Sequence, residues 1–179
     1  MFDFLRVLIG FFERNNIPYM LSGSMAMSTY TVPRFTRDFD FIVHLKKENI
    51  DLLLEQFSEG YYCDKDAVKE AIATKTMFNI IDHKSGYKAD FMMLKNEPFR
   101  QVEFDRRIKI VFLDMSLYIV SPEDLLISKL VWIQAIQGNL QAEDIKSLAA
   151  LPQIDWDYIW HWINTLKLNT FNLLNDRHS

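Results

Sequence analysis

The feature that most constrains this chain is Asp38-Phe39-Asp40, which opens an apolar run that reaches Leu45. In a β-strand, residues two apart project from the same face, so both carboxylates share one side while Phe39 and Phe41 enter the other. Two like charges side by side are unfavourable unless cations lie between them. Mg²⁺ prefers carboxylate oxygen, and two such ions about 3.5–4 Å apart clamp a phosphoryl displacement. The alternative is a solvated acidic strand end.

A second feature, Gly23-Ser24, follows the short apolar run Tyr19 to Ser22 and precedes a short helix. A strand that ends in Gly-Ser and opens a helix offers backbone N–H groups and a hydroxyl to an anion. Thirteen residues separate this dipeptide from Asp38, which allows one short helix and a return strand beside the first. Phosphates held at Ser24 would then lie near metals at Asp38 and Asp40.

A third carboxylate, Asp90, lies in the predicted strand from Tyr87 to Leu94 and shares a face with Lys88. A charged pair in an apolar strand is costly on a buried face and cheap in a cleft. Asp90 could bind a metal or accept a proton from an attacking hydroxyl, and Lys88 could offset phosphate charge. A lone Lys–Asp surface pair is the alternative.

Periodicity and turn residues predict the remaining elements. The expected helices are Phe2 to Arg14, Ser24 to Tyr30, Glu48 to Phe57, Ala67 to Thr74, Ser121 to Gln137, Ala142 to Leu151 and Asp155 to Leu168. The expected strands are Tyr19 to Ser22, Asp38 to Leu45, Tyr61 to Cys63, Thr76 to Asp82, Tyr87 to Leu94, Ile108 to Phe112 and Leu117 to Val120. This order predicts an α+β fold with a mixed β-sheet flanked by helices and a C-terminal helical part.

Composition narrows the setting. The formal net charge is −4, which argues against a broad basic surface that binds nucleic acid. A local basic cluster (Arg100, Arg106, Arg107 and Lys109) is predicted to be a solvated edge, with a path for a polyanionic acceptor such as tRNA as the alternative. The four tryptophans have helical spacing and are predicted to lie in the core. A single cysteine and no apolar run of about 18 residues predict a cytoplasmic protein with no membrane span.

The two segments Leu21 to Met27 and Pro33 to Val43, followed by Lys88-Ala-Asp-Phe, resemble the signature of the nucleotidyltransferase superfamily related to DNA polymerase β. The Gly and Ser of that signature fall on Gly23 and Ser24, its two metal-binding acids on Asp38 and Asp40, and its third acid on Asp90. The resemblance implies a nucleotidyltransferase-like core over residues 1–120 and a C-terminal helical subdomain over 121–179 packed on it.

Within this superfamily the chain is similar to AbiEii-type toxins of the small bacterial branch. Arg34 and Thr36 match its Arg-x-Thr-x-Asp form, and Ser121 to Leu125 with Lys129 match a later helix that opens with Ser-Pro-Glu-Asp-Leu. The resemblance places Gly23, Ser24, Arg34, Thr36, Lys88 and Lys129 at the nucleotide. A downstream Asp of that branch falls on Asp144, but Glu143 and Ser147 depart from the residues usual around it, so no role is assigned to Asp144.

The resemblance implies an enzyme that uses Mg²⁺ or Mn²⁺ to move an NMP from an NTP to a hydroxyl acceptor. The acceptor could be an RNA end such as that of tRNA, a protein side chain or a small molecule, and the enzyme could be a toxin with a cognate antitoxin. One alternative is a non-catalytic nucleotide-binding or toxin–antitoxin interaction module on the same fold. Another is a structural domain with an incidental Asp pair.

Overall fold

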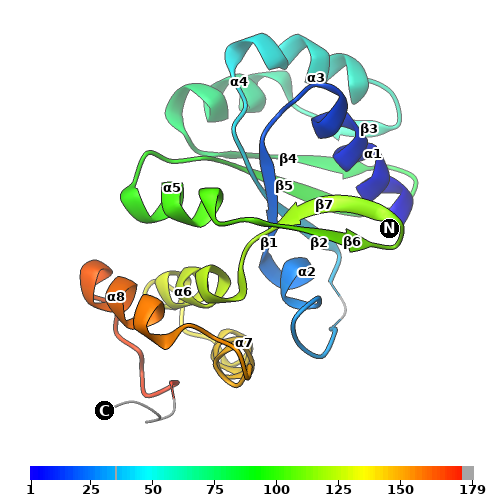
Figure 1. The fold of residues 1–179 in the computed structure, drawn as a ribbon. Helices are drawn as coiled ribbons and strands as arrows, with labels where there is room; N and C mark the ends of the chain where they lie inside the picture. The colour runs from blue at the N-terminus through cyan, green and yellow to red at the C-terminus, as the bar shows by residue number, and fades with distance from the viewer. Residues whose placement is uncertain (35, 175–179) are drawn as a thin grey trace. The chain divides into compact units, whose positions relative to one another are not determined.

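The computed structural model describes residues 1–34 and 36–174. The chain divides into two compact units, one formed by Met1–Ala26 with Arg34–Val120 and the other by Met27–Pro33 with Ser121–Ser179. The first unit holds a β-sheet with its helices, and the second is helical (Figure 1).

The sheet of the first unit has seven strands in the order β3-β4-β5-β2-β1-β7-β6. The strands are β1 (Tyr19–Ser22), β2 (Asp38–Val43), β3 (Tyr61–Cys63), β4 (Met77–Asp82), β5 (Lys88–Met93), β6 (Ile108–Phe112) and β7 (Met115–Ile119). β2 lies between β1, which runs antiparallel to it, and β5, which runs parallel to it. The predicted mixed sheet is therefore confirmed, and so is the return of the chain from β1 into the adjacent strand β2.

Helix α1 (Phe2–Arg14) covers one face of this sheet through an aromatic cluster (Figure 1). The Phe12 ring lies 5.3 Å from Phe41 of β2 and 5.9 Å from Phe91 of β5, and the Phe4 ring lies 6.1 Å from Phe39. All of these phenylalanines are at most 2 % exposed. Burial of so much aromatic surface fixes which face of β2 and β5 is the core face.

The other helical segments of the sheet unit are the 3-10 turn η1 (Lys47–Asn49), α3 (Ile50–Gln56), α4 (Lys65–Thr74), α5 (Pro98–Asp105) and α2 (Gly23–Met27), whose last residue is counted with the second unit. The helix predicted from Ser24 to Tyr30 ends earlier, at Met27. The sequence prediction missed α5, although Pro98 at its first position is a helix-start signal. Only two turns long, α5 is too short for an apolar repeat to stand out.

The second unit contains α6 (Pro122–Ile133), α7 (Asn139–Ala149) and α8 (Trp156–Leu166). Ser121 caps α6: its hydroxyl accepts from the Asp124 backbone N–H at 3.2 Å and donates to the Asp124 carboxylate at 2.7 Å. The Tyr158 hydroxyl of α8 donates to the other oxygen of Asp124, which is fully buried. Of the four tryptophans predicted to lie in the core, Trp162 is buried, Trp156 and Trp160 are half-buried, and Trp132 at the end of α6 is 56 % exposed, so the prediction is wrong for Trp132 and holds in full only for Trp162.

Within the described residues, we find no helix with the length and apolar character that a membrane span needs.

Cys63 on the edge strand β3 is half-buried, and burial together with the nearby Asp64 carboxylate raises the pKa of its thiol to about 11. At pH 8 the folded protein should carry about 100-fold less thiolate at Cys63 than a thiol with the ordinary pKa of about 9. We expect slow alkylation by iodoacetamide in the folded protein and rapid alkylation in urea, measured by mass spectrometry. Equal rates in the two states would contradict this environment.

Candidate functional site

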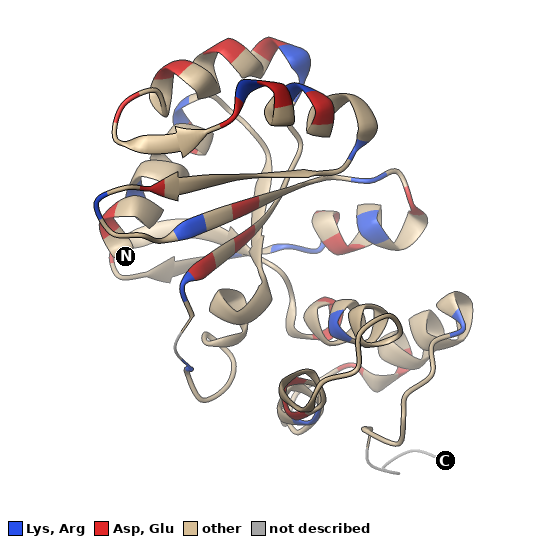
Figure 2. Cartoon of the chain, turned by 180° about the vertical axis from the view of Figure 1, so that it is seen from behind, with Lys and Arg blue, Asp and Glu red and all other residues tan. Residues whose placement is uncertain are grey.

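The parallel pairing of β2 with β5 brings the predicted acidic residues together. Asp40 lies directly opposite Asp90, and Asp38 lies opposite Lys88. On the other side of β2, Asp40 is opposite Ser22 of β1. In Figure 2, acidic bands on two adjacent central strands lie side by side next to a basic band. The four charged residues therefore share the sheet face opposite the phenylalanines that pack under α1.

Lys88 lies among these carboxylates. Its Nζ is 2.7 Å from Asp90 Oδ2 and 4.0 Å from Asp38 Oδ1. The hydrogen bond to Asp90 raises the pKa of the Lys88 ammonium above its ordinary value, and the charges of Asp90, Asp38 and Asp40 add to this against the opposing effect of burial. The Asp90 side chain is 13 % exposed, and its Oδ1 atom is buried without a hydrogen-bond partner. Asp38 is more open, with 49 % of its side chain exposed.

Gly23 lies against the Asp40 carboxylate at the start of α2. A Cβ atom built on Gly23 would lie 1.9 Å from Asp40 Oδ2, and the backbone φ of +62° also disfavours a side chain. Both the contact and the dihedral therefore require glycine here. This close approach brings the turn that precedes α2 to the acidic face of β2.

Ser24, Arg34 and Thr36 are held by local hydrogen bonds beside this turn. The Arg34 guanidinium donates to the Ser24 hydroxyl at 2.8 Å. The Thr36 hydroxyl accepts from the Asp38 backbone N–H at 3.3 Å, which fixes the entry into β2. The structure thus places Gly23, Thr36 and Lys88 in contact with Asp40, Asp38 and Asp90. Ser24 and Arg34 are bonded to each other next to Gly23, in the same unit.

No group of three or more His, Cys, Asp and Glu side chains in residues 1–34 and 36–174 is arranged to hold a metal ion. The Lys88 ammonium lies between Asp38 and Asp90 instead. The donor set is nevertheless hard carboxylate oxygen, which suits Mg²⁺ or Mn²⁺. The buried, partnerless Asp90 Oδ1 is an unused ligand atom. The residues therefore fit a divalent cation in kind, and a cation would need Lys88 and the exposed Asp38 to rearrange.

The remaining predicted nucleotide residue, Lys129, belongs to the helical unit. Its Nζ lies 2.7 Å from Asp144 Oδ2, which links α6 to α7, and both side chains are at most 10 % exposed. The sequence alone does not indicate this pair, because no spacing rule predicts an ion pair between residues fifteen positions apart on two helices.

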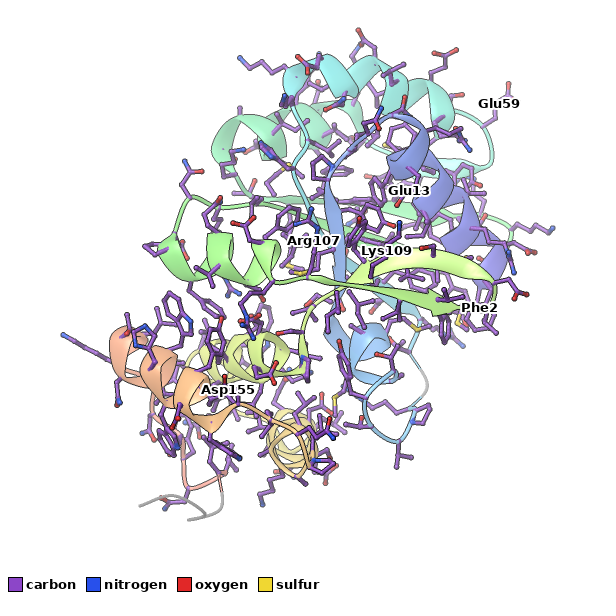
Figure 3. The ribbon with its side chains drawn as sticks, in the orientation of Figure 1. Phe2, Glu13, Glu59, Arg107, Lys109 and Asp155 are labelled. Atoms are coloured by element: carbon purple, nitrogen blue, oxygen red, sulfur yellow. The ribbon has the colours of Figure 1, made fainter. Side chains whose placement is uncertain are left out.

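Three side chains of the basic cluster contact aromatic rings or an acidic residue of the sheet unit. The Arg107 guanidinium lies 4.4 Å from the Phe104 ring centroid and 5.1 Å from that of Tyr118, and Lys109 lies 5.4 Å from Tyr118. Figure 3 shows Arg107 and Lys109 close together over the β6–β7 hairpin. Arg100 forms a 2.8 Å ion pair with the buried Glu103. The pair with Glu103 offsets the charge of Arg100, whereas the ring contacts leave the charges of Arg107 and Lys109 in place, and Lys109 is exposed.

A family model described as nucleotidyltransferase of unknown function (DUF6036) matches residues 2–178. The chain belongs to this family. No curated protein gives a significant sequence match. The family match confirms the prediction of a nucleotidyltransferase, whereas the relation to DNA polymerase β and the similarity to the AbiEii-type branch stay predictions.

Solved structures support the nucleotidyltransferase fold. The chain is similar to the antibiotic-resistance factor ANT(2'')-Ia, with a TM-score of 0.63, 9 % identity, and 91 % of this chain and 89 % of that chain covered. The chain is also similar to an antigenic nucleotidyltransferase-like protein from Paracoccidioides brasiliensis. The TM-score is 0.56 and the identity 17 %, with 89 % of this chain and 84 % of that chain covered. A third similar structure is that of lincosamide antibiotic adenylyltransferase LnuA, lincomycin-bound. Its TM-score is 0.56 and its identity 15 %, with 82 % of this chain and 94 % of that chain covered. At these identities the likeness establishes the fold alone.

Gly23→Ala tests the close approach to Asp40. We expect a loss of stability of about 1–2 kcal/mol from the left-handed backbone, together with displacement of the Asp40 carboxylate. Gly86→Ala is the matched control, because Gly86 has a φ of +69° but no atom within 4 Å of a built Cβ. Both variants should unfold at lower urea concentration, and Gly23→Ala should be the less stable of the two, because only its added Cβ meets Asp40. Equal losses of stability in the two variants would contradict the contact.

Lys129→Met tests the buried ion pair in the helical unit. The variant removes the ammonium that faces the buried Asp144 carboxylate, and loss of one partner of a buried ion pair costs about 3–5 kcal/mol, which urea unfolding would measure. The double variant Lys129→Met with Asp144→Leu removes both charges and should recover most of this loss. If the free energy of unfolding of the single variant lies within about 1 kcal/mol of that of the unmodified protein, the ion pair does not stabilise the helical unit.

Proposed function

We propose that this nucleotidyltransferase uses a divalent cation to transfer an NMP from an NTP to a hydroxyl acceptor. The observation that carries the proposal is the alignment of Asp38, Asp40 and Asp90 on one sheet face with the Gly23 turn packed on Asp40. Carboxylates and an anion-binding turn are the two parts that metal-assisted phosphoryl chemistry needs at one place.

Asp38, Asp40 and Asp90 would hold the cation, Mg²⁺ or Mn²⁺. When bound, the cation would neutralise phosphate charge and favour attack at phosphorus. The protein's own contribution is to hold these oxygens in fixed register on two hydrogen-bonded strands, which is the rigid support that such a site requires.

The residues around the Gly23 turn would bind the triphosphate. The backbone N–H groups at Gly23 and Ser24, the Ser24 hydroxyl and the Arg34 guanidinium are donors suited to phosphate oxygens. Arg34 already contacts Ser24 at 2.8 Å, so the two can act on one phosphate group. Thr36 orients the backbone at Asp38. The predicted role of Lys88 as a further phosphate contact belongs to the same proposal. Lys129 lies in the other unit and is paired with Asp144, so its contact with phosphate stays a sequence prediction and carries no step here.

In the proposed reaction, the acceptor oxygen forms a bond to the α-phosphorus of the NTP while the bond to the bridging oxygen breaks. Pyrophosphate leaves with the electron pair of that bond. The acceptor proton passes to Asp90, or to solvent if Asp90 serves only as a metal ligand. The protein would act mainly by position and by charge neutralisation.

Three acceptor classes fit this chemistry: an RNA end, a protein side chain and a small molecule. The net charge of −4 and the ion pair of Arg100 with Glu103 favour an acceptor other than a long polyanion. Two proteins of similar fold are named for antibiotics, which are small molecules. The toxin-type role with a cognate antitoxin rests on the sequence resemblance.

The second candidate is a non-catalytic nucleotide-binding or interaction module on the same fold. It is favoured by the lack of a preformed three-residue metal cluster among the described residues. Such a module would bind an NTP without a requirement for divalent cation and would transfer nothing to any acceptor.

Asp40→Asn separates the two candidates, because it removes one negative charge with little change of shape. We expect Mg²⁺-dependent NTP binding to be lost and transfer from α-labelled ATP, CTP, GTP or UTP to total tRNA, lysate proteins or small lysate metabolites to fall by about 100-fold or more. The matched control is Asp105→Asn, an exposed acid at the end of α5, which should be unchanged. Transfer by Asp40→Asn at the unmodified rate would refute the role of Asp40, and no transfer by the unmodified protein to any of these acceptors would favour the binding module.

A further inference from the structure

The ammonium of Lys88 lies beside the carboxylates that would bind the cation in the proposed site. It makes a 2.7 Å contact with Asp90 and lies 4.0 Å from Asp38, across the two paired strands. The strand register dictates this position: Lys88 is opposite Asp38 on β2 and two residues before Asp90 on its own face of β5. A residue on the core face could not reach either carboxylate.

We propose that Lys88 is a resident counter-ion of the metal-free site, and that a divalent cation binds there only by displacing its ammonium group. This inference rests on the proposed function and adds a role that the predicted contact of Lys88 with phosphate does not contain. It makes Lys88 a positioning residue that tunes cation affinity before any nucleotide arrives.

Asp90 is the carboxylate that depends most on this lysine. Its side chain is 13 % exposed and one of its oxygens is buried without a partner, so water does little to screen its charge. A buried carboxylate without a counter-charge is costly. Asp38, at 49 % exposure, is screened by solvent and needs Lys88 less.

The Lys88 ammonium can also move away from Asp90 and Asp38. Its side chain is 35 % exposed and has four rotatable methylene groups, so the ammonium can move several ångströms without a change of backbone. An NTP would supply phosphate oxygens as new partners for the displaced group. A free cation offers no such compensation.

This exchange predicts that cation and NTP bind cooperatively. A cation alone must break the Lys88–Asp90 ion pair, whereas a cation that arrives with NTP gives Lys88 a new partner. Differential stabilisation of this kind appears as a coupling between the two ligands.

The test measures Mn²⁺ binding to the nucleotide-free protein by electron paramagnetic resonance. We expect Lys88→Met and Lys88→Gln to bind Mn²⁺ about tenfold more tightly than the unmodified protein and to show less gain in Mn²⁺ affinity on addition of a non-hydrolysable NTP. Lys88→Arg keeps the charge and should keep the weaker affinity. Lys69→Met, which removes an exposed lysine of α4, should leave Mn²⁺ affinity unchanged.

Asp40→Asn in the same assay separates the two proposals. If Mn²⁺ binding is lost in Asp40→Asn but is equal or weaker in both neutral Lys88 variants, the counter-ion role is wrong and the proposed metal site stands. If no Mn²⁺ binding depends on Asp40, with or without NTP, both proposals fail. If the neutral variants melt at lower temperature without Mn²⁺ and recover with it, the counter-ion role is supported directly.

Discussion

The alternation of side chains along β2 and β5 is the constraint on which the rest of the structure depends. One face of this strand pair carries Phe39, Phe41 and Phe91 into the aromatic cluster under α1, so the opposite face must carry the acids. A slip of one residue would bury charge and expose phenylalanine. The packing of the core and the position of the acidic site are thus consequences of one pattern.

Much of this arrangement could be predicted from the sequence because it depends on local periodicity. The two-residue alternation placed Asp38 with Asp40 and Lys88 with Asp90, and the thirteen-residue separation from Gly23-Ser24 predicted the β1–β2 return that the structure confirms. The family match confirms that the chain is a nucleotidyltransferase, as those residues predict. The chemical roles of those residues remain proposals.

Contacts between distant segments could not be predicted in this way. Nothing in the spacing indicates that Lys88 lies between Asp38 and Asp90, because that depends on the parallel register of β2 and β5. The pair formed by Lys129 and Asp144 depends likewise on how α6 packs on α7. Trp132 follows the helical repeat but lies on the exposed side. Periodicity shows that a face is apolar without showing what covers it.

The parallel pairing of β2 with β5 also affects how the protein folds. The two strands are hydrogen-bonded neighbours, yet η1, α3, β3, α4 and β4 lie between them in the chain. A contact between segments so far apart must close a long loop before it gains any stabilising energy. The acidic site should therefore form late, as the central strands come together. Partly folded chains would have local helices and the β4–β5 hairpin but no place to bind a nucleotide.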